Sequence, residues 1–157
     1  MGTRSTITFT ARYEDGDVSL VKIYQQYDGY IKGVGYELAE WLNKKKIVNG
    51  ITYGEDNTNC ANGLGCLAAQ FIKEFKKDIG GLYITEMSDT EDYNYNVIVD
   101  EYKTGNLDDF TIISITNWDN EEPIFVGKPS ELLEFKESDI EDYGSGLNYN
   151  RKSGINY

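Results

Sequence analysis

The sequence has 157 residues, a formal net charge of −12 and no histidine, and this length is typical of one domain with its own hydrophobic core. The missing histidine excludes every catalytic arrangement that needs an imidazole base, and it removes the commonest zinc ligand. The two cysteines are too few for a four-cysteine zinc site. Because no stretch resembles a signal peptide or a membrane span, we expect a soluble, cytoplasmic protein.

The negative charge is concentrated in the second half of the chain. Residues 1–80 contain ten acidic and ten basic residues, whereas residues 81–157 contain 17 acidic and 5 basic residues. Duplex DNA and anionic membranes are therefore poor partners for the second half, but a basic protein surface would be attracted to it. The simpler interpretation is that the acidic surface only keeps the protein soluble.

The chain opens with the pattern of a β-hairpin. Apolar and polar residues alternate over residues 3–13, which predicts a half-buried strand with Ile7 and Phe9 on the buried face and threonines on the solvent face. Asp15-Gly16 is typical of a tight turn. A second strand over residues 18–26 is expected to pair back antiparallel.

Two helices follow the hairpin. A glycine-rich loop over residues 27–35 leads into a predicted helix over 35–45, and a polar segment over 49–62 reads as a loop. The second helix is predicted over 64–79, because an apolar stripe runs from Leu64 to Ile79 at helical spacing.

Shorter elements fill the rest of the chain. Strands are predicted over 82–86, 93–102, 110–117 and 124–126, and a short helix over 129–135. Together these elements indicate an α+β fold, in which an antiparallel sheet opened by the N-terminal hairpin carries two main helices on one face. We expect one domain over residues 1–136 and a polar C-terminal tail over 137–157, through which the chain can form a homo-oligomer.

Glycine-rich turns precede both predicted helices. Helix N-termini present unpaired N–H groups, and glycine lets an anion approach the backbone, although neither turn matches a phosphate-binding fingerprint. Tyrosines, amides and cations surround the first turn and would suit a nucleotide-like anion. The candidate ligand-binding residues are Arg4, Tyr24, Gln26, Tyr27, Asp28, Gly29, Tyr30, Lys32, Gly33, Asn62 and Gly63. The alternative is that the glycines only permit turns and the tyrosines only pack.

An enzyme would have to use carboxylates, tyrosine, lysine or arginine. Adjacent acids such as Asp108 and Asp109 point to opposite faces of a strand, so they are poor acid–base pairs. We assign no catalytic residue, no metal site and no cofactor. A metal-dependent hydrolase that uses carboxylates remains an alternative.

Three motifs occur together in the first half of the chain, at residues 2–4, 24–30 and 62–70. Their combination resembles a family of small, functionally uncharacterised phage and bacterial proteins with an N-terminal GTR and a Y-x-x-(Y/W)-D-G-Y motif. The resemblance covers about residues 1–100, and Ile31 stands where many relatives have proline. It implies a phage setting, in which small accessory proteins often counter host defence.

The sequence therefore favours a non-enzymatic binding protein without direct nucleic-acid or membrane contact. In the first hypothesis it is a phage-type anti-defence protein that sequesters a nucleotide-like ligand, in a hollow shared by the loop over 27–35 and the start of the second helix. In the second it is an acidic, nucleic-acid-mimicking inhibitor of a host defence protein, which requires the carboxylates of residues 86–142 to lie on one surface.

Overall fold

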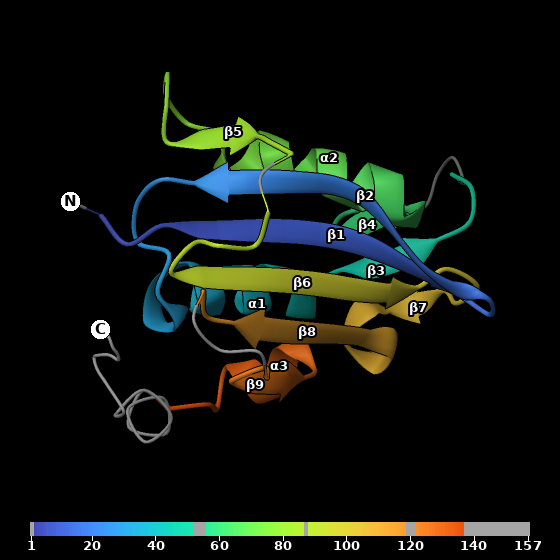
Figure 1. The fold of residues 1–157 in the computed structure, drawn as a ribbon. Helices are drawn as coiled ribbons and strands as arrows, with labels where there is room; N and C mark the ends of the chain where they lie inside the picture. Colours follow the sequence, from blue (N-terminus) through green and yellow to red (C-terminus); the bar gives the residue numbers. More distant parts are fainter. Residues whose placement is uncertain (1, 52–55, 87, 119–121, 137–157) are drawn as a thin grey trace.

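The fold combines two sheets with helices on one side (Figure 1). The computed structural model describes residues 2–51, 56–86, 88–118 and 122–136. Its mixed helix and strand content confirms the predicted α+β class. The predicted tail over 137–157 lies outside the described residues.

The larger sheet has six strands in the order β5-β2-β1-β6-β8-β9. Its strands are β1 (Ser5–Tyr13), β2 (Gly16–Gln25), β5 (Leu82–Ile84), β6 (Tyr93–Asp100), β8 (Thr111–Thr116) and β9 (Phe125–Gly127). β1 and β2 form the predicted antiparallel hairpin. The prediction of an antiparallel sheet is wrong at one place, because β1 and β6 pair in parallel. Between them the chain passes through two helices and returns to the end at which β1 starts, which a hairpin cannot do.

Two helices cover one face of this sheet, as predicted (Figure 1). They are α1 (Tyr36–Asn43), which follows a π-helical turn over Ile31–Gly35, and α2 (Gly63–Phe75). α2 ends four residues before Ile79, the predicted end of its apolar stripe. A short helix, α3 (Pro129–Leu132), lies near the last strand. The main buried side chains between sheet and helices are Ile7, Phe9, Ile23, Leu38, Leu42, Leu67, Phe71, Tyr95, Val97, Ile113 and Ile115.

A second, three-stranded sheet escaped the sequence analysis. It consists of β4 (Cys60–Asn62), β3 (Lys46–Val48) and β7 (Gly105–Asn106), and a 3-10 helical turn over Leu107–Phe110 follows β7. The end of the predicted loop over 49–62 is therefore a strand. Strands of two or three residues carry no readable alternation, so the pattern could not reveal them.

The face of the larger sheet opposite the helices, which we call the outer face, carries mainly small polar side chains. Thr6, Thr8 and Thr10 were predicted to face solvent, yet all are buried, because β1 has a strand on either side. The Thr6 hydroxyl donates a hydrogen bond to Asn94 Oδ1 at 2.7 Å, and the Thr10 hydroxyl donates one to Asn96 Oδ1 at 2.6 Å. Cross-strand bonds therefore satisfy polar groups that the sequence pattern assigned to water.

Candidate functional site

The first two of the three sequence motifs touch each other in the fold. The backbone N–H of Gly29 donates a hydrogen bond to the carbonyl of Thr3 at 2.9 Å. A Cβ at Gly29 would lie 2.7 Å from the Cβ of Ser5, and a Cβ at Gly2 would lie 2.6 Å from Cδ1 of Tyr27. These contacts are too close for any side chain larger than glycine, so the two motifs need each other for packing.

Internal hydrogen bonds hold the loop after β2 in an unusual backbone path. Asp28 adopts a left-handed conformation with φ 58°, and its carbonyl accepts the N–H of Val34 at 2.9 Å. The N–H of Gly33 donates to the carbonyl of Tyr30 at 3.0 Å. The buried hydroxyl of Tyr95 donates to the carbonyl of Gly29 at 2.7 Å. The amides of Gly29, Gly33 and Val34 are therefore bonded within the protein, and the predicted phosphate cradle lacks these donors.

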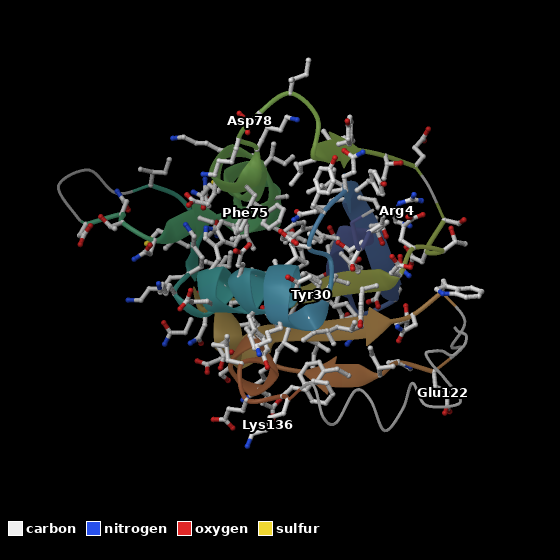
Figure 2. All side chains as sticks on the ribbon, turned by 90° about the vertical axis from the view of Figure 1, so that its left-hand side faces the viewer. Arg4, Tyr30, Phe75, Asp78, Glu122 and Lys136 are labelled. Atoms are coloured by element: carbon white, nitrogen blue, oxygen red, sulfur yellow. The ribbon has the colours of Figure 1, made fainter. Side chains whose placement is uncertain are left out.

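The same loop exposes aromatic and charged side chains. Tyr27 is 55 % exposed and Tyr30 is 39 % exposed. Arg4 and Lys32, two of the predicted ligand-binding residues, are exposed as well. Figure 2 views this end of the molecule and shows Arg4 and Tyr30 on it. A hydrogen-bonded loop with exposed tyrosines and cations can stack on a ring, pack on a protein surface, or pair with an anion.

A second segment, the turn between α2 and β5, is clamped to this loop. The N–H of Gln26 donates to the carbonyl of Gly81 at 2.8 Å, and the Gly81 N–H donates to Gln26 Oε1 at 3.4 Å. Within the turn, the Lys76 ammonium donates to the carbonyls of Gly80 at 2.8 Å and Leu82 at 3.0 Å. The turn is thus fixed at both of its ends.

This clamped turn presents apolar side chains to solvent. Ile79 is as exposed as in an extended chain, at 103 %, and Tyr83 is 46 % exposed. The ring centroids of Tyr83 and Tyr24 lie 6.0 Å apart, and the ammonium of Lys76 lies 5.5 Å from the centroid of the Tyr83 ring. We call the exposed side chains of Arg4 and of residues 27–32 and 79–83 the tyrosine end.

The structure brings together most, but not all, of the predicted ligand-binding residues. Arg4, Tyr27, Asp28, Tyr30 and Lys32 belong to the tyrosine end, and Gln26, Gly29 and Gly33 support it from within the same loop or directly before it. Tyr24 borders this end: it pairs with Thr6 on β1 and with Tyr83 on β5, and its ring lies against that of Tyr83. Ile79 and Tyr83 were missed as site residues. The helical spacing of apolar residues predicts Ile79 as part of the second helix. The charged residues at positions 76–78 are the sequence signal that the helix ends earlier, at Phe75.

Asn62 and Gly63 lie at the other end of the molecule. Asn62 pairs with Val48 in the small sheet, and its side-chain oxygen accepts the N–H of Gly50 at 2.8 Å. Gly63 begins α2, whose 13 residues span about 20 Å before the turn at Lys76. The loop over 27–35 and the start of α2 therefore lie at opposite ends of the described fold (Figure 1), too far apart to line one hollow as predicted.

Acidic residues of the second half lie near both ends of β6 in the described ranges. Asp89 and Asp92 precede β6, whereas Asp100 ends it, and eight strand residues span about 26 Å. Several acids also have local partners: Asp89 pairs with Lys22 at 2.7 Å, and Asp92 accepts the N–H of Arg4 at 3.0 Å. These two acids are therefore bonded within the protein.

Metal and membrane signals are also absent from the described residues. No group of three or more Cys, Asp or Glu side chains there could hold a metal ion. No helix in the same residues is long and apolar enough to cross a membrane. Comparison of the chain with protein-family models, curated proteins and solved structures found no match.

Proposed function

We propose that this chain is a non-enzymatic binding protein and that it contacts a partner protein through the tyrosine end. The observation that carries this proposal is the exposure of Tyr27, Tyr30, Ile79 and Tyr83 on two segments that hydrogen bonds join. Tyrosine is enriched among the residues that dominate binding energy at protein interfaces. Solvent-exposed apolar groups on ordered segments add little to folding and are available for binding.

Preorganisation supports the same proposal. The loop combines a left-handed Asp28 with a π-helical turn over Ile31–Gly35, and such backbone features are frequent at functional sites. A surface that is already fixed loses less conformational entropy on binding than a flexible one. The hydrogen bonds of Gln26 and Lys76 would thus improve affinity without touching the partner.

A small nucleotide-like anion is a second candidate for the same surface. It is favoured by two exposed cations, Arg4 and Lys32, in the same set as the exposed rings of Tyr27 and Tyr30, because rings can stack on a base and cations can pair with phosphate. It is disfavoured by the internal use of the loop amides. The resemblance of the motifs to phage proteins supports an anti-defence role for either partner, and a host defence protein is the first partner class to test.

The test compares two double variants that remove similar side chains at different places. Tyr27→Ala with Ile79→Ser changes the tyrosine end, and Tyr102→Ala with Val126→Ser changes exposed residues outside it, at 70 % and 58 % exposure. Each protein is immobilised and used to capture proteins from a bacterial lysate, and bound proteins are quantified by mass spectrometry. We expect one protein to be captured by the wild type and by the control pair but not by the tyrosine-end pair.

Two outcomes decide between the candidates. Equal capture by both double variants would refute the tyrosine end as the contact surface. A thermal-shift screen of nucleotides against the wild type tests the second candidate, since a ligand that binds only the folded state raises its melting temperature. A rise that Tyr27→Ala abolishes, together with no captured protein, would replace the protein partner by a nucleotide.

A further inference from the structure

A hollow of about 170 Å³ lies at the end of the sheet remote from the tyrosine end. It is lined by Arg12, Ile98, Lys103, Phe110, Ile112 and Lys128, together with two acids, Asp100 and Asp109. Arg12 and Asp100 are neighbours in the register of β1 and β6 and lie near the ends of these strands, whereas the tyrosine end adjoins the strands' starts. The hollow is therefore a separate feature from the surface described above.

The floor of the hollow is apolar, unlike its surroundings. Ile98 and Ile112 are cross-strand neighbours on β6 and β8, and both are half-buried. The adjacent positions on the outer face are polar, namely Thr10, Asn96 and Ser114. The two isoleucines therefore form an apolar spot on a polar face, which favours contact with an apolar body.

Two of the three cations that line the hollow form no ion pair with the described residues. Arg12 is held by Asp17, with two hydrogen bonds of 3.0 Å. Lys103 and Lys128 form no ion pair within the described ranges, although acids line the same hollow. Because Asp17 already neutralises Arg12, Lys103 and Lys128 are the lining cations that can pair with a negatively charged ligand.

We propose that this hollow binds a small organic carboxylate, with its apolar body on Ile98 and Ile112 and its charge between Lys103 and Lys128. The volume is below the roughly 300 Å³ at which pockets for drug-sized ligands begin, so the ligand is a small one. Asp100 and Asp109 disfavour ligands with two negative charges. Binding in the hollow thus requires both a negative charge and an apolar body on the ligand, and the probes of the test separate these two properties.

The experiment follows backbone amide signals of the isotope-labelled full chain by nuclear magnetic resonance. Phenylacetate supplies a carboxylate on an apolar body, benzyl alcohol supplies the body alone, and inorganic phosphate supplies charge alone. We expect saturable shifts at Ile98 and Ile112 with phenylacetate, binding about tenfold weaker with benzyl alcohol, and no saturable shifts there with phosphate.

Matched variants test the charged rim. Lys103→Gln with Lys128→Gln is expected to weaken phenylacetate binding about tenfold. Lys73→Gln with Lys77→Gln makes the same charge change on α2 and its exposed C-terminal flank, and should leave binding unchanged. The proposal is overturned if phenylacetate causes no saturable shifts in the hollow, if benzyl alcohol or phosphate binds there as well as phenylacetate, or if both lysine pairs have the same effect.

Discussion

Gly29→Ala tests whether the contact between the two N-terminal motifs holds the loop in place. The added Cβ would lie 2.7 Å from the Cβ and 2.8 Å from the Oγ of Ser5, and 2.9 Å from the carbonyl carbon of Arg4. Gly29 and Ser5 are both buried. Because Arg4 offers backbone rather than a flexible side-chain end, the new methyl group cannot be accommodated by a rotamer change alone.

The expected loss of stability follows from overpacking. Extra carbon atoms in a packed interior destabilise by about 1–3 kcal/mol, and the three close contacts place Gly29→Ala in the upper part of this range. In a domain of this size each kcal/mol lowers the melting temperature by about 2–4 °C. We therefore expect thermal unfolding, followed by circular dichroism, to shift down by about 4–12 °C.

Gly65→Ala is the matched control. Gly65 lies within α2, is exposed, and has no atom within 4 Å of an added Cβ. The same chemical change should there stabilise by about 0.5–1 kcal/mol, because alanine loses less backbone entropy in a helix. The reasoning is refuted if Gly29→Ala is as stable as the wild type while Gly65→Ala behaves as expected.

Further predictions concern buried hydroxyl groups and one surface ion pair. Thr111 is 1 % exposed and its Oγ1 has no hydrogen-bond partner among the described residues, so Thr111→Val should leave unfolding in urea unchanged or raise stability by about 1 kcal/mol. Thr6→Val loses the bond to Asn94 and should lower stability by about 1–2 kcal/mol; equal effects of the two variants would contradict the hydrogen-bond assignment. Hydrogen bonds from Arg12 hold the pKa of Asp17 below its ordinary value, so their contribution to stability is present above the unfolded-state pKa and is lost as pH falls through the folded-state pKa. A carboxyl titration by nuclear magnetic resonance should show Arg12→Gln moving this pKa back up, and an unchanged pKa would contradict the pairing.

Local patterns were enough to predict the elements that carry most of the core. The alternation around Ile7 and Phe9 and the Asp15-Gly16 turn signal correctly placed the opening hairpin. The apolar stripe from Leu64 correctly indicated α2, because a long amphipathic pattern is the strongest local signal. Its end was misjudged at Ile79, which continues the helical spacing by chance and is fully exposed.

Long-range pairing could not be predicted in the same way. The parallel pairing of β1 with β6 depends on where the chain returns after two helices, and no residue in either strand encodes that direction. The burial of Thr8 follows from the same pairing, since a strand with neighbours on both sides loses its exposed edge. Such features arise from tertiary context rather than from the periodicity of one segment.

The candidate site was predicted in part for similar reasons. The motif around Tyr27 and Gly29 marked a loop with special backbone demands, and the structure adds the contact partner, the N-terminal motif. Asn62 and Gly63 share the glycine-rich composition but lie one helix length away. Composition could not show that the two glycine-rich turns lie at opposite ends of the fold, because their positions depend on the directions in which the two helices run.

The most direct test of the central claim is the affinity of the captured partner for the two double variants. The account predicts that Tyr27→Ala with Ile79→Ser weakens binding at least tenfold, since interface anchors contribute about 2 kcal/mol or more each. It predicts that Tyr102→Ala with Val126→Ser binds like the wild type. Full affinity in the tyrosine-end variant, or equal losses in both variants, would contradict the assignment of this surface as the binding site.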